Sequence, residues 1–319
     1  MNKDLVSIAD LTREEIYRLF DRAHQLKSKI RQQGRILLLN GKVMALVFEK
    51  PSLRTRVTFE AGILQMGGAG IYLAPGDIGL GKRETVPDVA ANLSRWVDII
   101  VARTFAHETV LCLAENARIP VINALCNLEH PCQALADFLT ILDRRKTIEG
   151  TVLAWVGDGN NVCHSLMLGA GLLGVHLRVA TPLGYEPKPD YVELARTLAG
   201  RSGARIELGT DPKQAVNDAE FVYTDVWTSM GDEAQAAERR RVFAPYQVNA
   251  KLLRVAHKNH KVMHCLPAHR GDEITAEVLD GPHSIVLDQA ENRLHIQRAI
   301  VAELITKNAL SRQPLAVSR

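Results

Sequence analysis

The first part of the chain alternates short apolar runs with longer segments whose apolar residues recur every three or four positions. A capping box formed by Thr12 and Glu15 predicts an initial helix to about Arg31, with Gly34 as its stop. The short apolar runs predict strands at 43–49, 71–74, 97–102 and 121–123. The longer segments predict helices at 57–66, 85–96 and 106–117. This alternation predicts a parallel sheet with helices on both faces.

A second series of the same kind begins after a long predicted helix at 131–146, which has Pro131 at its first position. The apolar runs there predict strands at 152–156, 175–180, 206–208, 221–224 and 262–264, with helices after residue 161 and from residue 190. The polar segment 232–241 is expected to be a surface insertion. A closing helix with apolar residues at three-to-four spacing begins at residue 289.

The length of the chain fits two domains. At 319 residues it exceeds the usual size of a single domain. The sequence therefore predicts an α/β fold of two doubly wound parallel-sheet domains linked by two interdomain helices. The expected domains are 1–146, completed by the C-terminal helix 289–319, and 147–288.

Composition excludes several classes of protein. The 39 basic and 36 acidic residues are spread along the chain and give a net charge of +3, too balanced for a nucleic-acid surface. The first ten residues lack a signal-peptide core, and no apolar run approaches membrane-spanning length. The five cysteines form no CxxC pair, so we expect reduced thiols in a cytoplasmic protein.

The first candidate site is the turn between the strand at 43–49 and the helix behind it, with the sequence SLRTR at 52–56. Unpaired backbone N–H groups at a helix start favour an anion. Ser52 and Thr55 add hydroxyls and Arg54 adds a guanidinium, which together suit a phosphate or carboxylate. The alternative is that Arg54 and Arg56 are solvated charges and Ser52 is only the N-cap.

Two further groups follow later strands of the first domain. Arg103 comes directly after a predicted strand and can reach the same edge of the sheet, or can be a surface charge. His130 and Gln133 lie at the start of the helix at 131–146. The positive helix end favours a neutral imidazole, which with the amide can polarise a carbonyl. Capping of the helix by both side chains is the alternative.

In the second domain, the turn Gly157–Asn161 follows a strand and invites a dinucleotide interpretation. Val162 occupies the place of the third glycine, so the two asparagines better suit a small carboxylate; a simple helix start is the alternative. Asp225, also at a strand end, can hold an ammonium group.

The segment around His264, Cys265 and His269 contains residue types that bind zinc or act as nucleophiles. No second Cys or His pair stands at ligand spacing, so we expect no metal. A covalent role for Cys265 needs a partnered base, which the sequence does not specify.

Taken together, these motifs resemble the aspartate/ornithine carbamoyltransferase family along nearly the whole chain. The ordered motifs are SLRTR at 52–56, Arg103, HPCQ at 130–133, GDGNN at 157–161, DVWTSMG at 225–231, HCLPAHRG at 264–271 and ENR at 291–293. Aspartate-specific members share the first and third motifs but differ in the later ones. The later pair therefore indicates ornithine.

The resemblance implies the reaction and its residues. The δ-amine of L-ornithine would attack carbamoyl phosphate directly, giving L-citrulline and phosphate, in the direction of arginine biosynthesis. The implied carbamoyl phosphate-binding residues are Ser52, Leu53, Arg54, Thr55, Arg103, His130, Gln133, Cys265, Leu266 and Arg293. The implied ornithine-binding residues are Asn161, Asp225, Ser229 and Met230, and the implied catalytic residues are Arg103, His130 and Cys265. The family also implies domain closure, no cofactor, and a homotrimer with sites at subunit interfaces.

Two positions depart from the family pattern. Leu53 stands where relatives have threonine, but that position acts largely through its backbone N–H. Gly79, in the long loop 74–84, stands where relatives place a His or Gln that reaches the neighbouring subunit. Lys82 is a candidate substitute. Two alternatives stay open: a carbamoyltransferase for an N-acylated ornithine, and a non-catalytic amino-acid- or nucleotide-binding protein.

Overall fold

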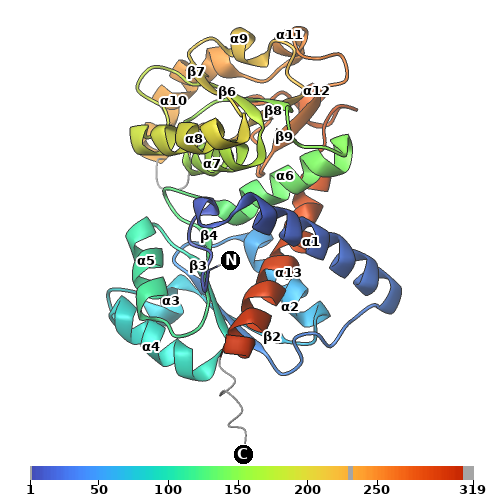
Figure 1. Ribbon diagram of the computed structural model, residues 1–319. Helices are drawn as coiled ribbons and strands as arrows, with labels where there is room; N and C mark the ends of the chain where they lie inside the picture. Colours follow the sequence, from blue (N-terminus) through green and yellow to red (C-terminus); the bar gives the residue numbers. More distant parts are fainter. Residues whose placement is uncertain (1, 229–232, 312–319) are drawn as a thin grey trace, which may run out of the picture. The chain divides into compact units, whose positions relative to one another are not determined.

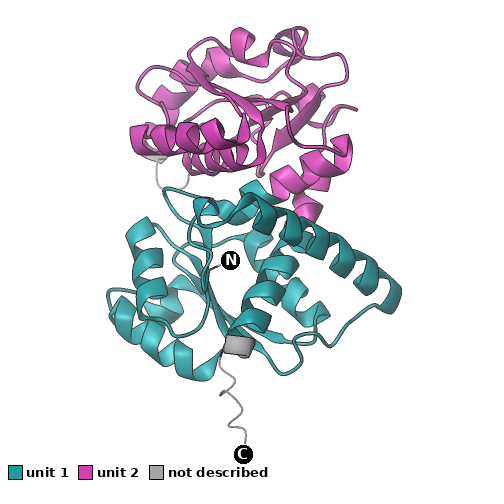
Figure 2. Cartoon of the chain, in the orientation of Figure 1, with its two compact units in different colours: residues 1–135, 293–319 teal, residues 136–292 magenta. Residues whose placement is uncertain are grey.

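The computed structural model describes residues 2–228 and 233–311. The chain forms two compact units, residues 1–135 with 293–319 and residues 136–292 (Figure 2). The divisions fall inside α6 (Pro131–Arg145) and α13 (Val286–Ser311), so each of these helices contributes to both units. They are the two linking helices that the sequence predicted.

The first unit contains a parallel sheet. Its four strands, counted over the described residues, are β1 (Val43–Phe48), β2 (Ala69–Leu73), β3 (Ile99–Arg103) and β4 (Val121–Leu125), in the order β2-β1-β3-β4. In the register of β1 and β3, Phe48 is the partner of Arg103. The direction in which strands are added reverses between β1 and β3, which is where open α/β sheets place ligands.

Helices cover both faces of this sheet. They are α1 (Arg13–Gln33), α2 (Leu53–Gln65), the short α3 (Pro75–Ile78), α4 (Val86–Trp96) and α5 (His107–Asn116), with η1 (Ile8–Asp10) near the N-terminus. Alternate strand residues such as Val47 and Ala102 pack with α4 and α5 in one apolar core. Figure 1 shows α1, α2 and α13 on the other side. The predicted cap of Thr12 and Glu15 and the stop at Gly34 are both confirmed.

The second unit repeats the architecture. Its strands, again among the described residues, are β5 (Val152–Val156), β6 (His176–Ala180), β7 (Ile206–Gly209), β8 (Phe221–Thr224) and β9 (Lys261–His264), in the parallel order β7-β6-β5-β8-β9. Strand order reverses between β5 and β8, so this is a second doubly wound sheet. The predicted fold class is confirmed.

Six helices and two 3₁₀ turns surround the second sheet within the described residues, besides the linking helices α6 and α13 where they enter the unit. The surrounding elements are α7 (Asn161–Leu173), α8 (Pro189–Ser202), α9 (Pro212–Val216), η2 (Glu233–Gln235), α10 (Ala236–Phe243), η3 (Ala244–Tyr246), α11 (Ala250–Leu253) and α12 (Ala276–Leu279). Ala154 and Val222 pack with α9, α11 and α12 in one core. On the other face, the rings of Trp155 and Tyr223 pack 5.1 Å apart.

The polar segment 232–241, expected to be a surface insertion, forms most of α10 and is exposed along most of its described residues. The exception is Arg239, which is buried, as is Phe243 just beyond the segment. Residue 232 lies outside the described residues. The Arg239 guanidinium donates to the Trp227 carbonyl and to the Asp158 carboxylate, and it lies 4.8 Å from the centre of the Tyr185 ring. Burial of a paired arginine is invisible to a hydrophobicity pattern.

No helix within residues 2–228 and 233–311 has both the length and the apolar character needed to cross a membrane. The five cysteines, all in described positions, form no disulfide.

Candidate active site

The turn after β1 begins α2 at Leu53, with Ser52 as its N-cap. The Thr55 N–H donates to Ser52 Oγ at 3.2 Å, so the predicted capping role of Ser52 is confirmed. This cap leaves the hydroxyl hydrogen of Ser52 available, because an oxygen that accepts an N–H can still donate its own hydrogen. The turn therefore combines a helix N-terminus, a hydroxyl and the first-turn residue Arg54.

Thr55 is the meeting point of two distant segments. Its side chain is buried, and its Oγ1 accepts a hydrogen bond of 2.8 Å from the Arg293 guanidinium on α13. Arg293 itself is buried, although more than two hundred residues separate it from the turn in sequence. Arg103, at the end of β3, is buried beside the end of β1.

His130 lies at the start of α6, and its carbonyl accepts the Gln133 N–H at 3.0 Å. Burial lowers the pKa of its imidazole well below the ordinary value of 6.5. The positive charges of Arg293, Arg103, Lys50 and Arg54 lower it further, in that order. His130 is therefore neutral at pH 7 within a cluster of cations, all from the first unit.

Lys50 was missed by the sequence analysis, although it directly precedes Pro51 and the SLRTR motif. Its charge acts on His130, and its Nζ lies 4.9 Å from the centre of the Phe105 ring. Its position next to an arginine-containing turn was the sequence signal that could have identified it as a further cation of the site.

Arg56, the last residue of the SLRTR motif, contacts Tyr72 and Glu60 instead of the other candidate residues. Its guanidinium lies 3.8 Å from the centre of the Tyr72 ring, and its Nε donates to Glu60 at 3.3 Å. The alternative of a helix-start charge outside the site is therefore the right one for Arg56.

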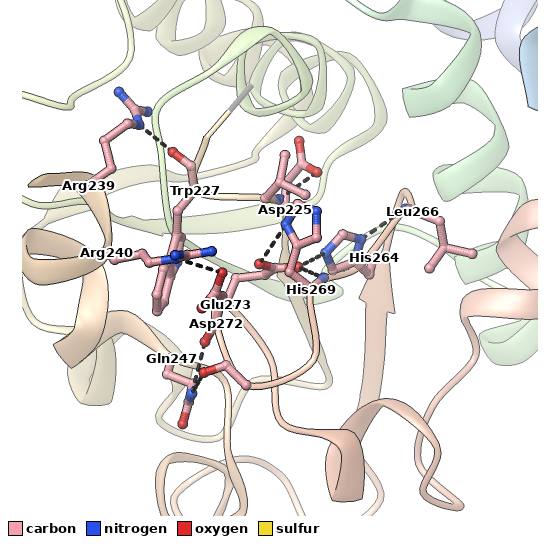
Figure 3. Close-up of polar contacts among 12 residues, drawn as sticks. Asp225, Trp227, Arg239, Arg240, Gln247, His264, Leu266, His269, Asp272 and Glu273 are labelled. Carbon is pink, nitrogen blue, oxygen red and sulfur yellow. Dashed lines mark hydrogen bonds and ion pairs between the residues drawn. The ribbon is translucent and has the colours of Figure 1, made fainter. Parts of the chain in front are cut away.

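The second unit gathers a different set of groups around Asp225, which follows β8 and is buried (Figure 3). Its carboxylate accepts hydrogen bonds from Asn160 Nδ2 at 2.8 Å, from Cys265 Sγ at 2.9 Å and from the Val226 N–H at 2.8 Å. The sequence analysis considered Asn160 only as one of two asparagines suited to a small carboxylate and did not foresee its bond to Asp225. The Asn160 side-chain oxygen also caps α7.

The segment after β9 is fixed by His264. The Leu266 N–H donates to His264 Nδ1 at 2.9 Å, and His264 Nε2 lies 3.2 Å from the buried carboxylate of Glu273 (Figure 3). Nδ1 accepts, so the ring hydrogen is on Nε2 and points to Glu273. Leu266 adopts a φ of 59°, in the left-handed region that side chains rarely occupy.

These same residues are the metal candidates. Asp225, His264 and Cys265 place potential ligand atoms within 4.8 Å of one another in the described part of the chain. Both ring nitrogens of His264 already have partners, however, and the Cys265 thiol donates to Asp225. A metal would have to displace these bonds, so this donor set does not fit one.

Gly159, in the turn after β5, has no room for a side chain. A Cβ at this position would lie 2.2 Å from the Pro187 nitrogen and 2.4 Å from the Glu186 carbonyl carbon. In a dinucleotide site this glycine would let a pyrophosphate approach the backbone. Here the loop at residues 186–187 occupies that space instead.

Most of the predicted residues fall into two groups. Ser52, Leu53, Arg54, Thr55, Arg103, His130, Gln133 and Arg293 lie in the first unit, or at its end of α6. Asn161, at the first position of α7, lies in the second unit with Asp225, Cys265 and Leu266. Ser229 and Met230 lie outside the described residues.

Family models match both parts of the chain. The carbamoyl-P binding domain of aspartate/ornithine carbamoyltransferase matches residues 3–143, and the Asp/Orn binding domain matches residues 149–304. The ornithine carbamoyltransferase of Thermococcus kodakarensis is 51% identical over 302 residues, which are 94% of this chain and 95% of that protein.

Solved structures agree with this assignment. The ornithine carbamoyltransferase from Pyrococcus furiosus has a TM-score of 0.91 at 49% identity, covering 94% of this chain and 96% of that one. The anabolic ornithine carbamoyltransferase from Campylobacter jejuni has a TM-score of 0.90 at 35% identity, covering 96% and 100%. The chain therefore belongs to the aspartate/ornithine carbamoyltransferase family and is a carbamoyltransferase.

Proposed function

We propose that this enzyme transfers the carbamoyl group of carbamoyl phosphate to the δ-amine of L-ornithine, giving L-citrulline and phosphate. The observation that carries the proposal is the neutral His130 surrounded by Arg293, Arg103, Lys50 and Arg54. A phosphate dianion needs the cations, and a carbonyl next to it needs neutral or cationic donors that do not ionise.

In the first unit, the phosphate is held by Ser52, the Leu53 N–H, Arg54, Thr55 and Arg103. The carbonyl oxygen accepts hydrogen bonds from His130 and Gln133, with Arg103 close by. Arg293 supports this arrangement through its bond to Thr55 at 2.8 Å. These donors stabilise the charge that develops on the carbonyl oxygen and on the departing phosphate.

In the second unit, the buried Asp225 carboxylate binds the α-ammonium of ornithine and Asn161 binds its α-carboxylate. We assign Ser229 and Met230, which lie outside the described residues, to its aliphatic chain by resemblance to the family. Cys265, whose thiol is 2.9 Å from Asp225, lies near the δ-nitrogen, and the Leu266 carbonyl binds the carbamoyl amine.

The chemical step follows from these assignments. The neutral δ-nitrogen forms a bond to the carbamoyl carbon, the carbon–oxygen bond to phosphate breaks, and the proton that the nitrogen gives up passes to the departing phosphate. An alkylamine titrates near pH ~10, so the site must favour the neutral form. Orienting the two reactants can contribute up to about 7–11 kcal/mol of the barrier reduction. The residues so assigned supply this chemistry without a cofactor.

A substrate panel tests the proposal. Purified enzyme is incubated with carbamoyl phosphate and, separately, with ornithine, acetylornithine, succinylornithine and aspartate, and the carbamoylated products are measured. We expect citrulline from ornithine and little product from the others. Faster carbamoylation of an acylated ornithine would establish the alternative substrate, and faster carbamoylation of aspartate would contradict the assignment of the second unit.

We further propose that the reaction runs towards citrulline, for arginine biosynthesis, in the cytoplasm. The match to a structure described as anabolic supports this direction. A comparison of the forward and arsenolytic reverse rates at physiological substrate concentrations would test it.

We also propose that the enzyme is a homotrimer with sites at subunit interfaces. Leu53, Val57 and Leu64 are exposed by 76%, 50% and 53% and, at spacings of four and seven residues, share one face of α2. An exposed apolar helix face suits contact with another subunit.

Gly79 adopts a left-handed φ of 54° at the end of α3, and the exposed Lys82 follows it. Lys82 then replaces the side chain that Gly79 lacks, and Lys82→Ala raises the KM for carbamoyl phosphate.

A further inference from the structure

The segment between β4 and α6, residues 126–130, is built around the buried thiol of Cys126. The sulfur accepts hydrogen bonds from the Glu129 N–H at 3.3 Å and from Asn123 Nδ2 at 3.4 Å. The Cys126 N–H donates to the Glu129 carbonyl at 2.9 Å. These bonds close a tight turn whose next residue is His130.

The same thiol contacts the loop after β3. His107, at the start of α5, places its Nδ1 3.2 Å from Cys126 Sγ. Burial raises the pKa of the Cys126 thiol and lowers the pKa of the His107 imidazole, so both groups are neutral at pH 7. A neutral pair at this distance fits an S–H that donates to an unprotonated Nδ1.

Backbone bonds accompany this contact along the two loops. The Thr104 N–H donates to the Leu125 carbonyl at 3.0 Å, and the Asn127 N–H donates to the Phe105 carbonyl at 2.9 Å. The His107 N–H donates to Asn127 Oδ1 at 2.9 Å. The loop that follows Arg103 is therefore bonded to the loop that precedes His130 at several points. Cys126 is the side chain at the centre of this junction.

We propose that Cys126 is a positioning residue, whose thiol holds the loops after β3 and β4 together and so sets His130 and Gln133 against Arg103. The proposal rests on the proposed function of the first unit. The thiol hydrogen has acceptors in His107 Nδ1 at 3.2 Å and the Glu129 carbonyl at 3.7 Å, and the sulfur accepts from the Glu129 N–H and the Asn123 amide. A hydroxyl has the same capacity, whereas a methyl group has none.

The test compares Cys126→Ala with Cys126→Ser in steady-state assays of the full-length enzyme. For Cys126→Ala we expect kcat/KM for carbamoyl phosphate to fall by between about 10-fold and 100-fold, because small misplacements of catalytic groups are costly. The KM for ornithine should stay at the wild-type value, because ornithine binds the other unit. Cys126→Ser should recover most of the loss.

Two further variants separate positioning from a general loss of stability. Cys163→Ala removes a thiol that is equally buried in α7 and should leave both KM values unchanged. His107→Ala should reproduce the Cys126→Ala defect, and the double variant should be little worse than either single one, since the two residues act through one contact. His107→Ala also carries the test if Cys126→Ala does not fold.

The outcomes distinguish the proposals. If the wild-type enzyme makes no citrulline, the proposed function fails. If the wild type is active but Cys126→Ala and His107→Ala lower only the melting temperature and keep wild-type kinetic constants, the positioning role is wrong. A Cys126→Ala variant that raises both KM values, as a loosened fold would, also overturns it.

Discussion

The ionisation of His130 is decided by its surroundings. A histidine on the surface would titrate near pH 6.5 and would be partly charged at neutral pH. Here burial, followed by the charges of Arg293, Arg103, Lys50 and Arg54, lowers its pKa well below that value. The neutral ring can then donate a hydrogen bond without adding a charge to the proposed phosphate site.

This shift has a consequence for stability. Below about pH 6.5 the unfolded chain binds a proton at His130 that the folded enzyme does not, so the folded state loses stability as the pH falls. Relative to His130→Gln, the free energy of unfolding of the wild type should fall by up to about 1.4 kcal/mol per pH unit below that point. Urea unfolding of both proteins from about pH 4.5 to about pH 7.5 measures this difference in the free energy of unfolding, because the range spans the ordinary pKa of histidine. The other histidines are common to both proteins and cancel. A difference that does not vary with pH would contradict the assignment.

Glycine roles also differ from one residue to the next. Gly159→Ala puts a Cβ 2.2 Å from the Pro187 nitrogen, whereas a Cβ at Gly200 in α8 meets nothing within 4 Å. We expect Gly159→Ala to destabilise the enzyme by about 1–3 kcal/mol or more. Gly200→Ala, the matched control, should stabilise it by up to about 0.5–1 kcal/mol. The melting temperatures of the two variants test these expectations. Equal melting temperatures would mean that the loop at residues 186–187 yields easily.

At the scale of elements, one side chain at the start of α7 serves both the helix and the site. The Asn160 side-chain oxygen accepts the Val162 and Cys163 N–H groups at 3.0 and 3.1 Å, while its amide nitrogen donates to Asp225 at 2.8 Å. The cap of α7 and the bond to the proposed ornithine-binding Asp225 therefore use opposite ends of the same amide.

Substitution can separate the two roles. Asn160→Ser keeps a capping oxygen but loses the donor to Asp225, so its stability should stay near that of the wild type while the KM for ornithine rises. Asn160→Ala loses both and should be less stable by about 1 kcal/mol as well. Denaturation curves and the KM for ornithine are measured for each variant. An unchanged KM in Asn160→Ser would show that this hydrogen bond does not orient Asp225.

α10 shows the limit of prediction at the level of elements. Its sequence is dominated by charged and small residues, which favours an exposed segment. Arg239 is nevertheless buried, because the Trp227 carbonyl, the Asp158 carboxylate and the Tyr185 ring come from three other segments. Only the folded chain brings these partners together.

At the scale of the whole molecule, the two sheets explain the placement of the candidate residues. In the first, Ser52 follows β1 and Arg103 ends the neighbouring strand β3; in the second, Asn161 and Asp225 follow β5 and β8. Both pairs lie at the position where strand order reverses. The same physical rule therefore places a candidate binding site at one edge of each sheet.

Assembly is testable at this scale. Glutamates in place of Val57 and Leu64 would put two charges on the exposed face of α2, so the proposed homotrimer should dissociate into smaller species. Leu194→Glu, at an exposed leucine of α8, is the matched control and should keep the wild-type mass. Sedimentation velocity measures both. An unchanged mass of the double variant would exclude this face from the subunit contact.

Much of the fold could be predicted because its signals are local. Strands such as β1 and β5 are continuous apolar runs, and the start of α1 is marked by side chains three residues apart that cap each other. The SLRTR and HPCQ motifs were found for the same reason. Lys50 was missed, and the bond of Asn160 to Asp225 was not foreseen, because these roles depend on Phe105, His130 and Asp225, which are distant in sequence.

The sequence by itself therefore determined the alternation of strands and helices, the doubly wound class and the motifs at strand ends, since each depends on neighbouring residues. Only the tertiary structure decided the neutral state of His130 and the pairing of Thr55 with Arg293. It also decided the burial of Arg239 and the packing of Arg56 against the Tyr72 ring. Hydrogen bonds and electrostatic effects act through space over a few ångströms, and folding alone sets which residues come that close.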